Sequence, residues 1–213
     1  RLLLIYCSIA LSARCTMDFL QNLCRFLHPP FLQPYTLNPA RTRLRYFSTA
    51  AGCSIIPEPE HSWEDYEIMK ILIVGATGDV GAAICNALQD RHELIRVGRK
   101  SGTYQVDVFD PNSVQDMYVN NGRIDAVVCA VGGVRFKHLS DHTPASMLFG
   151  LKRKVMGQIN LVLFGLDNVA DNGTFTLTSG ILDQTPMRAG AAASTANAAL
   201  AGFVKGASIE MPR

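Results

Sequence analysis

An apolar segment that runs directly into three evenly spaced glycines is the feature that most constrains how this chain can fold. Ile71 to Val74 are apolar, and Gly75, Gly78 and Gly81 follow at intervals of three residues. In this arrangement the first glycine takes a tight turn, the second lets a phosphate approach the backbone, and the third lets the next helix pack closely. Residues 82–88 continue with helical apolar spacing. The order of strand, glycine turn and helix predicts a dinucleotide pyrophosphate site.

The N-terminus of the predicted helix is expected to hold the anion. The backbone N–H groups of Asp79 and Val80 would face the phosphates, because the first amides of a helix have no intrahelical partner and the helix dipole favours negative charge there. Thr77 lies in the same turn and is expected at the site. The Asp79 carboxylate would repel phosphate, so we expect its side chain to point to solvent.

Charge is unevenly distributed along the chain. Residues 1–57 contain six arginines and one acidic residue, whereas five acidic residues cluster in residues 58–67. This shift predicts a targeting or disordered extension over residues 1–68 and a folded domain over residues 69–213. An Arg-rich, acid-poor extension is typical of an organellar presequence, and residues 43–50 resemble a mitochondrial processing site. A disordered tail, translated sequence upstream of a start at Met69, and a secretory signal remain alternatives; without the extension the protein would be cytoplasmic.

Composition excludes several classes of function. The net charge of +2 gives no general reason to expect nucleic acid binding, and the apolar run from Leu2 to Ala13 is too short to predict a membrane span. The six cysteines form no C-x-x-C pair, so no metal site is predicted. Cys85 and Cys129 fall on apparent core elements and are interpreted as small buried hydrophobic residues.

Strand and helix patterns alternate through the domain. The expected strands are residues 71–74, 92–98, 104–108, 124–130 and 173–178, and the expected helices are residues 82–88, 111–120, 144–170 and 189–209. Such alternation predicts an α/β fold with a Rossmann-type, doubly wound parallel sheet. Because the chain starts at Arg1 and stops at Arg213, we expect a fragment whose sheet is truncated at its C-terminus.

The end of the second expected strand predicts which cofactor is bound. An acidic residue there would bind the ribose 2′-hydroxyl of NAD, but this chain has Arg99, Lys100 and Ser101. A guanidinium, an ammonium and a hydroxyl suit a 2′-phosphate, so NADP(H) is favoured over NAD(H). The alternative is a solvated basic loop.

These residues resemble the short-chain dehydrogenase/reductase family over roughly residues 69–213. The resemblance is carried by Gly75 to Gly81, by Val106-Asp107-Val108, by Ala130-Val131-Gly132, by Leu177 to Gly180 and by Ala198 to Lys205. It implies that Asp107 and Val108 contact the adenine, that Ala130, Val131 and Gly132 lie beneath the cofactor, and that Ser179 takes the place of the catalytic serine. It also implies dimers or tetramers.

The chain departs from the family at the proton donor. The family uses a tyrosine whose pKa is lowered by a lysine one helical turn later, but the corresponding positions here are Ala193 and Asn197. The helix-four asparagine of the family falls at Lys154. The pattern resembles an atypical subgroup that retains the glycine-rich motif and lacks the usual active-site residues.

Two functions remain open from the sequence. One is an NADP(H)-dependent oxidoreductase of a small carbonyl or alcohol, with an unidentified substrate oriented by Ser179. The other is a catalytically silent dinucleotide-binding protein that senses redox state or binds a partner. His138 and His142 follow the fourth expected strand and are conceivable acids, although loop histidines without a role are more common.

Overall fold

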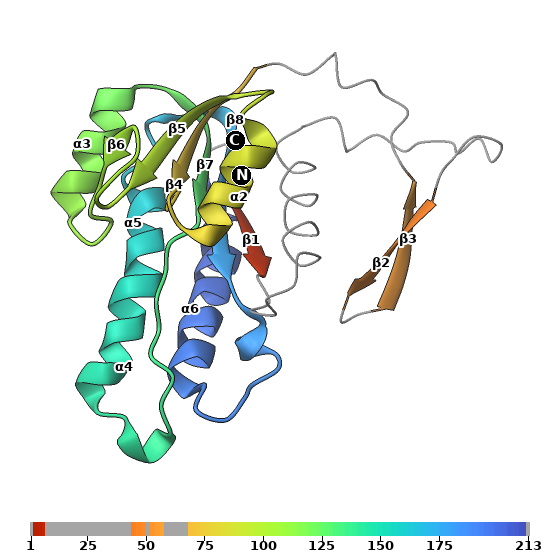
Figure 1. The fold of residues 1–213 in the computed structure, drawn as a ribbon, viewed down its shortest axis with the longest axis vertical. Coiled ribbons are helices and arrows are strands. Elements are labelled where there is room, and N and C mark those ends of the chain that lie inside the picture. Colours follow the sequence, from red (N-terminus) through yellow and green to blue (C-terminus); the bar gives the residue numbers. More distant parts are fainter. Residues whose placement is uncertain (1, 7–43, 50–51, 58–67, 212–213) are drawn as a thin grey trace. The chain divides into compact units, whose positions relative to one another are not determined.

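The computed structural model describes residues 2–6, 44–49, 52–57 and 68–211. Contacts divide the chain into two compact units. The smaller unit contains strands β2 (Leu44–Thr49) and β3 (Gly52–Pro57), which pair in antiparallel orientation (Figure 1). Both strands lie in the extension that we expected to be irregular. The expected targeting segment falls largely outside the described residues and stays a prediction, as do the boundaries of the extension.

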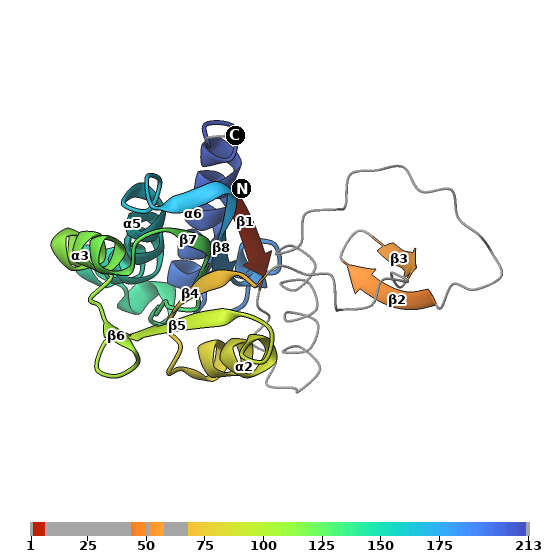
Figure 2. The ribbon, with the colours of Figure 1, turned by 90° about the horizontal axis from the view of Figure 1, so that it is seen from above.

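The larger unit is built on a six-stranded parallel sheet with the order β1-β8-β7-β4-β5-β6 (Figure 2). Its strands are β1 (Leu2–Tyr6), β4 (Lys70–Val74), β5 (Glu93–Gly98), β6 (Tyr104–Gln105), β7 (Ile124–Cys129) and β8 (Val169–Ser179). Successive strands step outward from β4 to β6 and then return to β7 on the other side. This reversal places a topological switch point between β4 and β7.

Helices cover both faces of the sheet, which confirms the predicted doubly wound Rossmann-type fold (Figure 2). The helical segments are α2 (Asp79–Leu88), α3 (Pro111–Asn121), η2 (Leu139–Asp141), α4 (Pro144–Gly150), η3 (Leu151–Met156), α5 (Gly157–Leu163), η4 (Ile181–Asp183) and α6 (Ala191–Ala207). One core includes residues of β4, β7 and α2, and a larger core includes residues of the sheet, α3, α5 and α6. The central strands are buried on both sides, as parallel strands require.

The helix expected over residues 144–170 is shorter than predicted. It runs through α4, a π-helical turn at η3, and α5, and it ends at Leu163, whereas β8 already begins at Val169. The buried Tyr118 hydroxyl donates a hydrogen bond to the Leu161 carbonyl at 2.6 Å. A side chain at Gly165 would lie 2.6 Å from the same hydroxyl. The chain therefore turns at Gly165, beneath a tyrosine from α3.

The strand expected over residues 104–108 was also predicted too long. β6 ends at Gln105, because the backbone turns at Asp107. The Asp107 carboxylate accepts a hydrogen bond from the Phe109 N–H at 3.1 Å, and the Asp107 carbonyl accepts one from the Asp110 N–H at 3.0 Å. A side-chain bond of this kind competes with the sheet ladder.

Two further predictions can be compared with the described residues. Cys85 and Cys129 are buried free thiols, as predicted. Across the described ranges, no helix has the length and apolar character needed to cross a membrane.

Candidate functional site

The glycine turn after β4 has the geometry that its sequence predicts. Gly75 has a φ of +90°, and a Cβ there would lie 2.8 Å from the Ala130 carbonyl oxygen. A Cβ at Gly81 would lie 2.0 Å from the Gly75 carbonyl oxygen, so α2 can approach the turn only with glycine at this position. At Gly78 the nearest such atom is 3.6 Å away, which leaves the backbone open to a ligand. The turn is thus tight toward β7 and open at the start of α2.

The N-terminus of α2 has no side-chain cap. Gly78 is the N-cap residue, and Asp79 is the first residue of the helix. The first N–H groups of any α-helix lack an intrahelical partner, so those of Asp79 and Val80 are available to an anion. Thr77 and Asp79 are exposed, which agrees with the expectation that the Asp79 carboxylate points to solvent.

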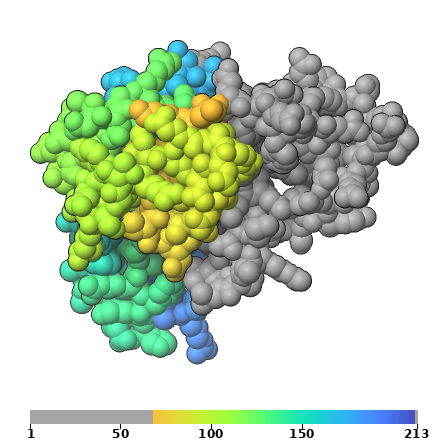
Figure 3. Space-filling model, turned by 45° about the horizontal axis from the view of Figure 1, so that its top comes forward, coloured from red at the N-terminus to blue at the C-terminus, as the bar shows by residue number. Residues whose placement is uncertain are grey.

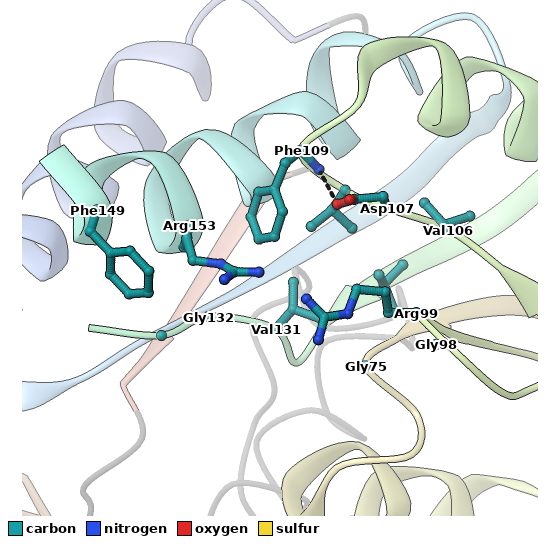
Figure 4. A pocket seen from close by; sticks show the side chains of 13 residues that line it. Gly75, Gly98, Arg99, Val106, Asp107, Phe109, Val131, Gly132, Phe149 and Arg153 are labelled. Atoms are coloured by element: carbon teal, nitrogen blue, oxygen red, sulfur yellow. Dashed lines mark hydrogen bonds between the residues drawn. The ribbon is translucent and has the colours of Figure 1, made fainter. Parts of the chain in front are cut away.

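A cavity of about 350 Å³ opens beside this turn, at the carboxyl ends of β4, β5 and β7 (Figure 4). It lies at the switch point of the sheet, where ligands of open α/β folds bind. Its lining residues are Val74, Gly75, Gly98, Arg99, Val106, Asp107, Val108, Phe109, Val131, Gly132, Gly133, Phe149 and Arg153.

The cavity brings together part of the set of residues predicted from the sequence. Predicted residues in its lining are Gly75, Arg99, Asp107, Val108, Val131 and Gly132. Predicted residues outside the lining are Thr77, Gly78, Asp79, Val80, Gly81, Lys100, Ser101, Ala130 and Ser179. Lys100 and Ser101 are exposed in the loop after β5. Figure 3 shows that the yellow-green segment of the chain forms a large part of the visible surface.

Arg153 and its aromatic neighbours were missed by the sequence analysis. The Arg153 guanidinium lies 4.8 Å from the ring centre of Phe109 and 5.4 Å from that of Phe149. Figure 4 shows Arg153 and Arg99 entering the cavity from opposite sides. Phe149 lies in α4 and Arg153 in the π-helical η3, so α-helical spacing gave no dependable signal for this pair in the sequence. Two guanidinium groups facing one cavity favour an anionic ligand.

Residues of α5 hold the part of the cavity wall around Phe109 in place. Asn160 is buried and donates a hydrogen bond from Nδ2 to the Val108 carbonyl at 2.9 Å. A Cβ at Gly157 would lie 2.8 Å from the Phe109 ring and 3.0 Å from the Val108 side chain. The segment from Asp107 to Phe109 is therefore held in place by side-chain hydrogen bonding and by close packing.

Ser179 lies at the carboxyl end of β8, next to the strand that ends at Cys129. Its side chain is 3% exposed, and its Oγ donates a hydrogen bond to the Asn197 carbonyl at 3.4 Å. The position where the family has its tyrosine, Ala193, is buried on α6 and carries no titratable group. Asn197, at the position of the family's lysine, accepts a hydrogen bond from Lys154 Nζ at 2.6 Å.

Cys129 and the two loop histidines are titratable groups near this edge of the sheet that do not suit the role of an acid in the cavity. Burial raises the pKa of the Cys129 thiol to about 12, so this residue stays neutral at physiological pH. His138 and His142 are not part of the cavity lining. His142 Nδ1 is 2.9 Å from the Ser146 hydroxyl at the start of α4.

Comparisons with known proteins agree with this geometry. The model of the NAD dependent epimerase/dehydratase family matches residues 71–180. Comparison with curated proteins returned no match. Among solved structures, the protein lin1944 from Listeria innocua is 44% identical with a TM-score of 0.66, over 68% of this chain and 72% of that chain.

Two further solved structures share the fold at lower identity. A small-chain dehydrogenase in complex with NADPH is 20% identical with a TM-score of 0.63, over 68% of this chain and 66% of that chain. A short-chain dehydrogenase from Streptomyces avermitilis is 18% identical with a TM-score of 0.61, over 68% of this chain and 61% of that chain. The family match spans the glycine turn and Ser179, and the chain belongs to the short-chain dehydrogenase/reductase family.

Proposed function

We propose that this protein is an NADP(H)-dependent oxidoreductase that acts on a small carbonyl compound or alcohol. The observation that carries the proposal is the cavity beside the glycine turn, into which Arg99 and Arg153 both point (Figure 4). An apolar floor, an open helix N-terminus and two cations suit a ligand with a flat base and several phosphate charges. The family supplies the class of reaction, a hydride transfer to or from the bound nicotinamide.

The preference for NADP(H) rests on the residues that follow β5. Arg99 lines the cavity at this strand end, and Lys100 and Ser101 follow it in an exposed loop. A guanidinium can bind a 2′-phosphate through two parallel hydrogen bonds. At the same strand end an acidic residue would favour NAD by binding the ribose hydroxyl and repelling the phosphate.

We derive the direction of the proposed dinucleotide from the order of the strands. Arg99 at the end of β5 would bind the 2′-phosphate, and the glycine turn after β4 would bind the pyrophosphate. The nicotinamide half would then extend across β7 toward β8, where Ser179 lies. The proposed substrate lies at this end, with Ser179 as a hydrogen-bond donor to its oxygen.

The test is a fluorescence titration of the full chain with NADPH and with NADH. We expect tighter binding of NADPH, and we expect Arg99→Glu to weaken NADPH binding at least about tenfold, because the variant replaces attraction with repulsion. Lys205→Glu makes the same charge change at an exposed position of α6 and should leave the affinity unchanged. Failure of the wild-type chain to bind either dinucleotide would overturn the proposal.

A second function is favoured by one feature of α6. Ala193 and Asn197 are both buried where the family has its tyrosine and lysine, so the usual proton donor is missing. A dinucleotide-binding protein without turnover would have this site and would need no donor. It would bind NADPH with the same sensitivity to Arg99→Glu but would oxidise no NADPH in the presence of carbonyl compounds.

A further inference from the structure

Lys154 extends across Gly132, in the segment that follows β7. It lies in η3, the π-helical turn between α4 and α5. A Cβ at Gly132 would lie 2.9 Å from Lys154 Cγ and 3.4 Å from Lys154 Cδ, so the aliphatic part of the lysine passes directly over this glycine. Gly132 also lines the cavity beside the glycine turn. The lysine therefore lies directly behind the part of the cavity wall that follows β7, without being part of the lining itself.

The ammonium group of Lys154 is held at a defined place. Its Nζ donates a hydrogen bond of 2.6 Å to Asn197 Oδ1, and Asn197 is only 2% exposed. The backbone carbonyl of Asn197 accepts the hydrogen bond from the Ser179 hydroxyl. An ammonium from η3 and a hydroxyl from β8 thus meet around a single residue of α6.

We propose that Lys154 is a catalytic residue, which donates a proton to the oxygen of the carbonyl substrate while Asn197 positions its ammonium. The inference rests on the proposed function, because it requires the nicotinamide half to lie between Gly132 and Ser179. In this arrangement the cation comes from the helix that follows β7, and the amide that holds it comes from the helix that follows β8. The two side chains replace a tyrosine and lysine on a single helix.

The proposed reduction accounts for the hydride, the electron pair and the proton. The carbonyl carbon accepts a hydride from the reduced nicotinamide, and the electron pair of the C=O π bond moves onto the oxygen. Lys154 donates one proton to that oxygen, which gives an alcohol, an oxidised dinucleotide and a neutral amine. The amine then regains a proton from water. An ammonium is also a point charge that stabilises the developing alkoxide before the proton moves.

Ser179 acts beside Lys154 as a second donor. Its hydrogen bond to the Asn197 carbonyl is long, at 3.4 Å, so the hydroxyl can rotate toward a substrate oxygen at little cost. A serine alone is a poor acid, because an aliphatic hydroxyl gives up its proton far less readily than an ammonium group does. In this proposal Ser179 orients the substrate oxygen and Lys154 donates the proton.

The test uses the full chain, NADPH and three carbonyl probes, namely 4-nitrobenzaldehyde, diacetyl and 9,10-phenanthrenequinone. The variant Lys154→Met keeps an aliphatic chain over Gly132 and removes the ammonium, and Lys154→Arg keeps a cation. Lys152→Met is the matched control, since Lys152 is exposed in the same turn. NADPH affinity, the rate of NADPH oxidation and the pH profile of kcat are measured for each protein, after circular dichroism shows that it is folded.

We expect the wild type to reduce at least one probe, and Lys154→Met to lower kcat about 100-fold or more with an NADPH affinity within about threefold of the wild type. Lys154→Arg should retain an intermediate rate, and Lys152→Met the full rate. The wild-type kcat should fall at high pH, where the ammonium loses its proton, and this fall should vanish in Lys154→Met.

Three results would overturn the proposal. They are NADPH binding without reduction of any probe, an unchanged kcat in Lys154→Met, and a high-pH fall that persists in that variant. If Lys154→Met does not fold, a rate for Lys154→Arg equal to the wild type with an unshifted pH profile also overturns it. Absence of NADPH binding by the wild type would overturn the proposed function as well, so the two failures are distinguishable.

Discussion

The side-chain amide of Gln158 forms hydrogen bonds with both backbone groups of Thr178. Its Nε2 lies 2.8 Å from the Thr178 carbonyl oxygen, and its Oε1 lies 2.9 Å from the Thr178 nitrogen. Gln158 is fully buried on α5, and Thr178 immediately precedes Ser179. One side chain therefore continues the backbone pairing of β8 beyond Leu177, the last residue that pairs with β7.

Replacement of Gln158 by leucine should destabilise the fold. The variant Gln158→Leu keeps the side-chain volume but leaves a backbone N–H and a carbonyl without this partner, at a cost of about 2–4 kcal/mol in the free energy of unfolding. Chemical denaturation measures the difference. Asn120→Leu removes an exposed amide that bonds Tyr104 and Asp116, and it should cost less than about 1 kcal/mol. Equal effects of the two variants would contradict the role given to Gln158.

Arg153 should contribute to dinucleotide affinity without discriminating between the two nicotinamide dinucleotides. It enters the cavity on the side opposite Arg99, so we expect it to act on charges that NADPH and NADH share (Figure 4). Arg153→Ala should weaken the binding of both by about tenfold, which corresponds to a loss of about 1.4 kcal/mol. Fluorescence titration measures both affinities. Arg135→Ala removes the other guanidinium that stacks on Phe149 and should have little effect, because Arg135 does not line the cavity.

Alanine at Gly81 should separate α2 from the glycine turn. The new Cβ would lie 2.0 Å from the Gly75 carbonyl oxygen and 2.8 Å from Ala76 Cα, so the backbone must move. We expect a loss of about 1–3 kcal/mol in the free energy of unfolding and weaker NADPH binding. Gly202→Ala is the control, since among the described residues no atom outside the backbone of its own helix lies within 4 Å of a Cβ built there, and alanine favours the helix. A Gly81→Ala protein as stable as Gly202→Ala would refute the close packing described here.

The stability of the fold should depend on the protonation of His92. Burial lowers the pKa of this histidine below its usual value, and the charge of Arg91 lowers it further. The folded protein thus binds the proton less readily than the unfolded chain, so stability is full above about pH 6.5 and is lost as the pH falls through this value toward the folded pKa. Denaturation at about pH 7.5 and about pH 5 should show a smaller loss in His92→Asn than in the wild type. An identical loss in both proteins would assign the pH dependence to other groups.

The fold and the glycine turn could be predicted because their signals are local in the sequence. The spacing of Gly75, Gly78 and Gly81 and the alternation of strands and helices each depend on short stretches of chain. The end of α5 was not predicted, because Tyr118 contacts Leu161 from a different helix. Gly165 and the following Asp167 and Asn168 are helix-stop signals that the prediction did not use, because the apolar Val169 and Ala170 continue beyond them.

The cavity was predicted only in part, for a similar reason. The residues that follow β4, β5 and β7 could be assigned from their place after expected strands, whereas Arg153 depends on the direction of a helical turn. η3 is π-helical, so helical periodicity from α4 does not carry across it unchanged. The contact between Lys154 and Asn197 joins two helices, and only the tertiary structure shows that the side chains meet.

The π turn also directs two adjacent residues to opposite ends of the site. Arg153 and Lys154 are adjacent in the chain, yet one lies against Phe109 in the cavity and the other crosses Gly132 to α6. A π turn holds one residue more than an α turn. Loss of the single residue between Leu151 and Arg153 would restore α-helical winding without rotating α4 relative to α5, because the π turn absorbs its extra residue locally. Arg153 and Lys154 would then leave their present directions, since both lie within that turn. The site would then be altered by a deletion that removes none of its contact residues.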